Sequence, residues 1–158
     1  MNKIILGLLL ICISLVASDN SGWPFACEQP SLAKFTAERY FPIGTISPFP
    51  LISADTQTIQ IDRKNKIIKV WLIWMASEQG RQLNIQYLGK VADYSNFGYN
   101  IELDVIDYDN MRVLIKSTTH YNCDASVIYP SSSGEWEDIR PASVMEGITQ
   151  KIKEKYNL

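Results

Sequence analysis

The segment from Tyr99 to Tyr121 constrains the fold more than any other part of the chain. Ile101, Leu103 and Val105 alternate there with polar residues, and this period of two is typical of a strand with one apolar and one polar face. A short polar turn follows, and then a second segment in which apolar and basic residues alternate. The segment therefore predicts a β-hairpin.

One register of this hairpin puts apolar residues opposite one another. If Leu103 pairs with Val113, the flanking apolar positions also pair, and Asp104 faces Arg112 on the other side of the sheet. A slip by one residue would move the apolar side chains into water, so we expect this register to be firm. The polar residues that alternate with Leu103 are then expected on the outer face, and Leu114 among the polar positions of the second segment suggests that this face is partly covered.

The rest of the chain predicts an α+β fold, an antiparallel sheet of about five to six strands with a C-terminal helix packed on one face. Residues 67–75 are rich in apolar β-branched and aromatic side chains, which predicts a central strand buried on nearly both faces, with a buried helix as the alternative. We also expect strands at 58–61, 83–87 and 125–129, a turn at 78–81, a loop or edge segment at 42–50 and a short helix at 31–40.

The last helix has a clear start signal. Ser143 and Glu146 have the spacing of a capping box, in which the hydroxyl accepts from the Glu146 amide and the carboxylate reaches back to a free N–H. An apolar stripe follows at helical spacing, formed by Met145, Ile148, Ile152 and Tyr156. Because a helix of this length needs tertiary packing, we expect the stripe to contact the sheet.

The N-terminus predicts export. Lys3 precedes an apolar run over residues 4–16, and small residues up to Ser18 suit a signal-peptidase site. The run is shorter than the ~20 residues needed to span a bilayer, so cleavage is favoured over an uncleaved anchor. Ile11 before Cys12 does not suit lipidation. We therefore expect a signal peptide at 1–18, an irregular or short helical segment at 19–55 and the folded domain at 56–158.

Cleavage would leave Cys27 and Cys123, and an even pair of cysteines in an exported protein predicts a disulfide. Two free thiols are the alternative. A metal site is disfavoured, because two cysteines and the lone His120 are too few ligands. The formal net charge of −2 gives no electrostatic reason to expect binding to nucleic acid or to an anionic membrane.

Several motifs occur in a recognisable order. Trp71 ends a strand that follows a charged turn, Tyr94-Ser95 precedes the segment 99–102, and the segment 136–143 (Trp-Glu-Asp-Ile-Arg-Pro-Ala-Ser) precedes the last helix. In this order, over roughly residues 56–152, the chain resembles the surface-adhesin E family of exported bacterial proteins. We expect structural roles for Trp71, Trp136, Pro141, Ser143 and Glu146. The resemblance implies a binding role towards host matrix or serum proteins.

The chain departs from that family at its cysteines. Family members often carry one Cys just after the 99–102 motif and another in the last helix, whereas Leu103 stands at the first place and no Cys follows Cys123. Both halves of that bridge are absent together. The pair Cys27 and Cys123 would then supply a different tether.

Motifs for catalysis or metal binding are weak. Residues 107–110 resemble the start of a calcium loop, but the Gly is missing and Thr118 stands where the twelfth-position Glu belongs, which favours a solvated turn. His120 has no nucleophile motif near it, and Ser131–Ser133 is typical of a loop. Trp136 lies among acidic residues, and we expect it to fill the core beside the last helix.

Four Trp and eight Tyr in a small chain can supply an aromatic binding face. The candidate partner-binding residues are Tyr87, Tyr94, Phe97, Tyr99 and Tyr108. We expect a non-enzymatic binding protein without a cofactor, in the periplasm or on the surface of a Gram-negative cell. The alternatives are a periplasmic inhibitor of a wall-degrading enzyme, acting through loop 107–110 or 131–134, and an enzyme.

Overall fold

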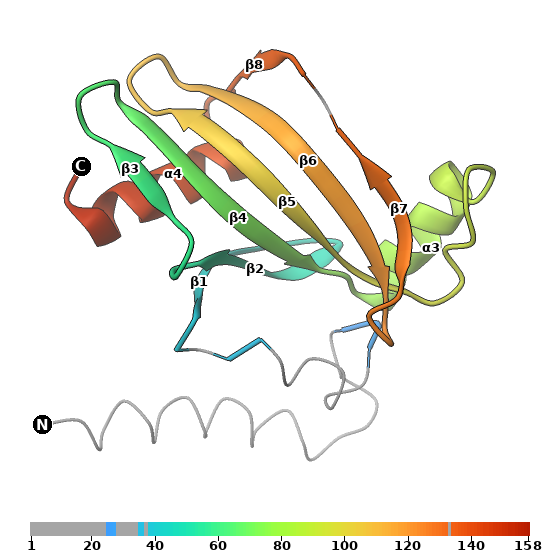
Figure 1. Ribbon diagram of the computed structural model, residues 1–158. Helices are drawn as coiled ribbons and strands as arrows, with labels where there is room; N and C mark the ends of the chain where they lie inside the picture. Colours follow the sequence, from blue (N-terminus) through green and yellow to red (C-terminus); the bar gives the residue numbers. More distant parts are fainter. Residues whose placement is uncertain (1–24, 28–34, 37, 133) are drawn as a thin grey trace, which may run out of the picture.

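The computed structural model describes residues 25–27, 35–36, 38–132 and 134–158 (Figure 1). The expected signal peptide at 1–18 lies outside the described residues, and so do residues 31–34 and 37 of the helix expected at 31–40. The last part of that expected helix is different, because residues 38–39 form a turn and Tyr40 begins a strand.

The described chain contains eight strands and two helices. In chain order they are β1 (Tyr40–Ile46), β2 (Phe49–Asp55), β3 (Gln60–Asp62), β4 (Ile67–Met75), α3 (Glu78–Leu88), β5 (Phe97–Asp107), β6 (Arg112–Asn122), β7 (Val127–Ser131), β8 (Trp136–Asp138) and α4 (Val144–Tyr156). The main sheet order is β1-β2-β4-β5-β6-β7, with β3 paired to β4 and β8 paired to β6, and every pairing is antiparallel. The α+β class is confirmed, with more strands than expected.

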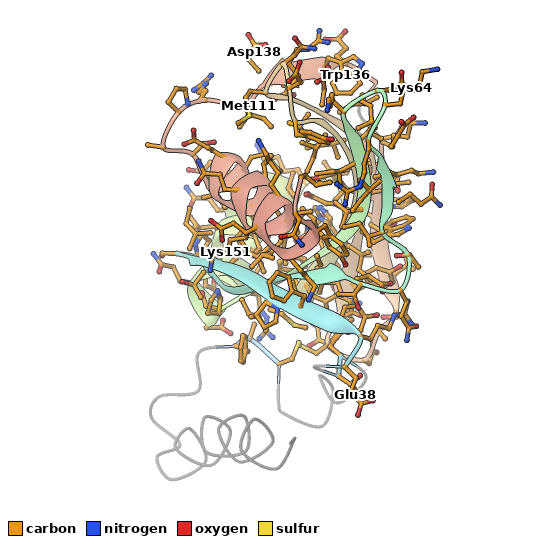
Figure 2. All side chains as sticks on the ribbon, turned by 90° about the vertical axis from the view of Figure 1, so that its left-hand side faces the viewer. Glu38, Lys64, Met111, Trp136, Asp138 and Lys151 are labelled. Carbon is orange, nitrogen blue, oxygen red and sulfur yellow. A yellow bond between two sulfur atoms is a disulfide. The ribbon has the colours of Figure 1, made fainter. Side chains whose placement is uncertain are left out.

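Helix α4 covers one face of the sheet, which we call the inner face. In Figure 2 this helix, in red, lies between the cyan strands β1 and β2 and the rest of the sheet. Ile148 and Ile152 of α4 are fully buried and join a core built from the inner-face residues of β1, β2, β4, β5 and β6. The amphipathic stripe of the last helix therefore packs on the sheet as expected, and β4 is a central strand as expected.

The capping box of α4 is confirmed. Ser143 Oγ accepts a hydrogen bond from the Glu146 amide at 3.2 Å. The Glu146 carboxylate reaches back to the Ala142 amide at 2.7 Å. Ala142, just after Pro141, has a positive φ of 58° and turns the chain into the helix. At the other end Arg63 donates to the backbone oxygens of Tyr156 and Asn157.

The hairpin of β5 and β6 is confirmed, but its expected register is wrong. Ile106 lies opposite Val113 and Asp107 opposite Arg112, and a bulge separates this part of the ladder from the part where Leu103 faces Ser117. The cause lies in the turn, where the Asp107 carboxylate accepts from the backbone and side-chain nitrogens of Asn110. This turn closes the hairpin later than the apolar pattern suggested.

The expected faces of β5 are also reversed. Ile106 and Asp104 point to the inner face and are fully buried, whereas Leu103 and Val105 lie half-buried on the opposite, outer face. The apolar alternation misled because the outer face is itself partly covered by protein. A period of two identifies two faces but does not say which of them the core occupies.

The turn expected at 78–81 and the strand expected at 83–87 are wrong, because residues 78–88 form α3. Ser77 caps the helix by accepting from the Gly80 amide at 3.2 Å. Gly80 packs so closely on the turn between β1 and β2 that an added Cβ would lie 2.8 Å from the Pro48 oxygen. The glycine therefore serves helix packing rather than a turn.

The segment expected to be irregular at 19–55 contributes two strands. Residues 42–50 were expected to form a loop or edge segment, and they belong to the hairpin of β1 and β2, which turns at the cis peptide Ser47–Pro48. β1 is an end strand of the sheet, where Pro42 can be accommodated at a register irregularity. The apolar side chain of Ile52 and the small Ala54 are buried on the inner face.

The expected disulfide is confirmed. Cys27 and Cys123 are bonded, with their Cα atoms 5.3 Å apart. Arg81 of α3 adds further ties, because its guanidinium donates to the backbone oxygens of Ala26 (2.5 Å) and Phe97 (2.9 Å). The disulfide thus joins the N-terminal part of the described chain to the end of β6.

This N-terminal part packs on the outer face. Phe25 and Phe35 contact the buried cluster of Ile73, Met75 and Tyr99. One half of the outer face is therefore covered by protein. The other half, towards β3 and β8, carries the candidate site.

Candidate binding site on the outer face of the sheet

The aromatic residues expected to bind a partner do not form a surface. Tyr94, Phe97 and Tyr99 are each 1% exposed, and Tyr108 is 7% exposed, so these four fill the interior. Tyr87 on α3 is 70% exposed and stands apart from them. The aromatic residues were expected to form a binding face, but four of the five candidates are buried and pack inside the protein.

The buried aromatics have structural partners. The Tyr94 hydroxyl lies 2.7 Å from His120 Nδ1, and Tyr99 stacks on Tyr121 with ring centroids 5.0 Å apart. Burial lowers the pKa of His120, which favours the neutral imidazole. These contacts give His120 the structural role that the sequence favoured.

The outer face instead presents a row of side chains that crosses five strands. The register places Gln60 opposite Lys69, Lys69 opposite Val105, Val105 opposite Leu114, and Leu114 opposite Trp136. Residues directly opposite in an antiparallel ladder point to the same face, so this row lies on one surface.

This row lines a shallow groove of about 380 Å³. The lining residues are Gln60, Asp62, Ile67, Lys69, Val105, Leu114, Lys116 and Trp136. The aliphatic side chains form an apolar floor, and the polar ones surround it. We call this feature the outer-face groove.

Trp136 is the most exposed apolar side chain of the groove. It was expected to fill the core, and this expectation is wrong, since it is 41% exposed. Its strand β8 pairs only with Arg112–Leu114 of β6, so the ring lies at the margin of the sheet. The Arg112 guanidinium carbon lies 5.3 Å from the ring centroid, and Arg112 is in turn bonded to Asp107 at 3.2 Å. The indole is thus held in place although it is accessible.

The acidic side chain of the groove is already occupied. Asp62 Oδ1 accepts from the amides of Lys64 and Asn65, and Oδ2 accepts from the Asn65 side chain. These hydrogen bonds, chiefly those from Asn65, hold the pKa of Asp62 below its usual range. By contrast, neither Lys69 nor Lys116 forms an ion pair with any described residue. The groove therefore presents positive charge that the described part of the chain does not neutralise.

A second polar cluster lies on the inner face. Glu102 accepts from Asn100 at 3.0 Å and lies 3.5 Å from the Thr118 hydroxyl. Burial raises the pKa of Glu102 to about 7. Burial, and then the charge of Glu102, raise the pKa of Asp104 to about 8. Raised carboxyl pKa values also occur in active sites, but Asp104 is fully enclosed and no substrate reaches it in this conformation.

The remaining residues singled out from the sequence are placed as follows. Trp71 is half-buried on the outer face opposite Leu103, and Pro141 is exposed before the α4 cap. Sequence reasoning missed Lys69, Lys116, Val105 and Leu114 as site residues. Two signals pointed to them: Leu114 interrupts the polar positions of its strand, and Lys69 is the one charge within the apolar run 67–75. No described group of His, Cys, Asp and Glu is arranged to hold a metal ion. Neither of the described helices is long and apolar enough to cross a bilayer.

Comparisons with known proteins add a distant structural likeness. No family model matches the chain, and no curated protein sequence matches it. Among solved structures, the chain is similar to protein E from non-typeable Haemophilus influenzae, at 12% sequence identity and a TM-score of 0.46. The similarity covers 73% of this chain and 77% of that one. Membership of the surface-adhesin E family thus stays a prediction from the sequence motifs.

Proposed function

We propose that this chain is an exported, non-enzymatic binding protein that recognises a protein partner through the outer-face groove. The observation that carries the proposal is the accessible Trp136 beside the apolar floor of Val105 and Leu114. Tryptophan is enriched among the residues that dominate binding energy at protein interfaces, particularly where apolar neighbours exclude water. The charged and polar residues around this floor resemble the rim of such an interface.

Rigidity of the surroundings supports the same proposal. The floor belongs to β5 and β6, the two long strands of the hairpin, and Trp136 is held by Arg112. The disulfide and Arg81 fix the other half of the outer face. A preorganised surface loses little conformational entropy on binding, so more of the contact energy contributes to affinity.

The finer part of the proposal concerns the partner. The motif resemblance of residues 56–152 favours an adhesin-like role on the cell surface, with host matrix or serum proteins as partners. The disulfide suits an oxidising compartment outside the cytoplasm, which is compatible with export.

A first experiment tests localisation. Protease is added to intact cells, and digestion of the protein is compared with and without permeabilisation of the outer membrane. Digestion on intact cells supports the adhesin-like role. Protection until permeabilisation excludes direct contact with host proteins and favours the alternative of a periplasmic partner, such as a wall-degrading enzyme bound by the ordered turn 107–110.

A second experiment tests the groove. Purified protein is applied to an array of matrix and serum proteins as wild type, Trp136→Ala and Tyr87→Ala. Tyr87→Ala is a matched control because it removes an exposed aromatic side chain outside the groove. We expect Trp136→Ala to weaken binding roughly tenfold or more, as for an interface anchor, and Tyr87→Ala to bind as wild type. Equal binding by all three proteins would exclude the groove as the binding surface.

A further inference from the structure

The groove has a charge pattern that selects among partners. Lys69 lies on β4 and Lys116 on β6, on either side of Val105 on the intervening β5, and Leu114 precedes Lys116 by two residues on β6. Two strands that are separated by a third lie about 10 Å apart, so the two lysines are held apart, with Val105 between their strands. The pattern is therefore positive, apolar and positive across the sheet.

The local bulge helps to present Lys116. The ladder of β5 and β6 pairs Asp104 with Ile115 and Leu103 with Ser117, which leaves Lys116 without a partner on β5. On the other edge of β6, β8 pairs with 112–114 and β7 with 118–121, so neither strand pairs with Lys116. Lys116 is accordingly exposed, and its side chain lines the groove.

The nearby acids do not cancel this charge. Asp62 is held by its own turn, and Asp107 accepts from Asn110 and Arg112. The unpaired lysines stand out on a chain whose formal net charge is −2. A ligand that brings carboxylates to Lys69 and Lys116 would gain ion pairs without displacing an existing one.

We propose that the outer-face groove binds an extended acidic peptide segment of the partner, in which an apolar side chain lies between two carboxylates. The apolar side chain packs on Val105 and Leu114 against the Trp136 ring, and the carboxylates meet the two lysines. In an extended peptide, which rises about 3.3 Å per residue, the side chains at positions i, i+2 and i+4 point to the same face, so an apolar residue with a carboxylate two positions to either side can direct all three side chains into the groove. This inference rests on the proposed binding function and adds the chemistry of the partner.

Nucleic acid is a poorer occupant of the same positive site. Affinity for a nucleic acid comes mainly from many phosphate contacts, and the groove offers two unpaired lysines and one carboxylate. The apolar floor would contribute nothing to phosphate binding. An acidic peptide uses both the charges and the floor.

The test is a selection from a random peptide library displayed on phage, carried out on the immobilised, oxidised full-length protein. Phage that bind the Trp136→Ala variant are removed in each round, after circular dichroism has verified that the variant is folded. We expect the remaining peptides to be enriched in Asp and Glu around one aliphatic or aromatic residue.

One enriched peptide is then measured by calorimetry against three proteins. We expect the double variant Lys69→Met/Lys116→Met to bind the peptide roughly three- to tenfold more weakly than wild type. Its affinity should also depend much less on salt concentration than that of wild type. Lys151→Met is the matched control, because Lys151 is an exposed lysine on α4, away from the Trp136 end of the molecule (Figure 2). It should bind as wild type.

The outcomes separate this inference from the proposed function. Enrichment of basic or uncharged peptides whose binding still requires Trp136 would contradict the inference of an acidic partner. The proposed binding function of the groove would remain supported. Failure to enrich any peptide that distinguishes wild type from Trp136→Ala would overturn both. An acidic peptide whose affinity is unchanged in the double lysine variant would also overturn the inference.

Discussion

Glu102 and Asp104 lie two residues apart on β5 and point together to the inner face of the sheet. Asp104 is fully buried, and neither of its carboxylate oxygens has a hydrogen-bond partner in the described structure. A buried carboxylate without a partner is costly, and protonation removes most of that cost. The pKa of Asp104 is accordingly raised to about 8 by burial and by the neighbouring Glu102.

This pair makes stability depend on pH in a stated direction. In the unfolded chain both carboxyls titrate near pH 4, whereas burial raises the native pKa of Glu102 to about 7 and that of Asp104 to about 8. The native state therefore binds these protons more tightly than the unfolded state. Their stabilising contribution is fully present below pH ~4 and is lost as the pH rises through the native pKa values.

We predict that Asp104→Asn stabilises the protein at pH 8.5 and has little effect at pH 4. The amide cannot ionise, so the variant escapes the cost of a buried charge. The expected gain in unfolding free energy at the higher pH is roughly 1–4 kcal/mol. Urea unfolding at a series of pH values measures it.

The matched control for this prediction is Asp138→Asn. Asp138 is an exposed carboxyl at the end of β8, and its replacement should shift stability by under about 0.5 kcal/mol at every pH. An effect of Asp104→Asn that does not change between pH 4 and pH 8.5 would show that Asp104 is not the titrating group.

The elements that could be predicted from the sequence carry their signals locally. The run 67–75 contains the β-branched and aromatic residues that favour a strand, and Ser143 and Glu146 mark the start of α4. The cysteine pair could be predicted because few pairings were possible. In each case a few adjacent residues, or two residues alone, decide the structure.

The misassigned elements depend on distant contacts. Alternation over 83–87 predicted a strand, but the Ser77 cap and the packing of Gly80 on Pro48 favour α3. The hairpin faces were reversed because a carboxyl, Asp104, occupies the core, against the ordinary preference of charged groups for water.

The candidate groove could not be predicted from the chain alone. Its row joins residues from Gln60 to Trp136 on five strands, and a change of one residue in any register would disperse it. The exposure of Trp136 was also hidden, because a tryptophan beside a helix start suggests a core position. Pairing with a single edge segment of β6 makes it accessible instead.

Gly98 provides a prediction about the disulfide. A Cβ added at Gly98 would overlap Cys27 Sγ and lie 3.1 Å from Cys123 Sγ. We predict that Gly98→Ala displaces the sulfurs and lowers the unfolding free energy by about 1–3 kcal/mol, with a larger fraction of free thiol after expression. Titration of thiols in denaturant and thermal unfolding measure both effects.

Gly147 is the matched control for Gly98. It lies on α4, where an added Cβ would meet no atom within 4 Å. Because alanine favours the helix over glycine, Gly147→Ala should stabilise the protein by about 0.5–1 kcal/mol, the opposite sign. Equal effects of the two substitutions would mean that the space beside the sulfurs is not limiting.

The cap of α4 gives a third prediction. Ser143 Oγ satisfies the Glu146 amide, which has no partner within the helix. Ser143→Ala should lower the unfolding free energy by about 1 kcal/mol, whereas Ser132→Ala, at an exposed loop position, should change it by under about 0.5 kcal/mol. Similar values for both serines in urea unfolding would contradict the assigned cap.

Arg81 gives the last prediction, because its guanidinium joins three parts of the chain at once. It donates to Ala26 and Phe97 oxygens and contacts Cys123 Sγ at 3.2 Å, and a lysine ammonium cannot reproduce this planar set of donors. Arg81→Lys should therefore lower the unfolding free energy by about 1–3 kcal/mol through the carbonyls left unpaired. It should also speed proteolysis at the N-terminal side of the disulfide. Arg140→Lys, at an exposed position, should leave both quantities unchanged. If Arg81→Lys lowers stability but leaves the proteolysis rate unchanged, Arg81 supports α3 alone and does not hold the N-terminal segment on the outer face.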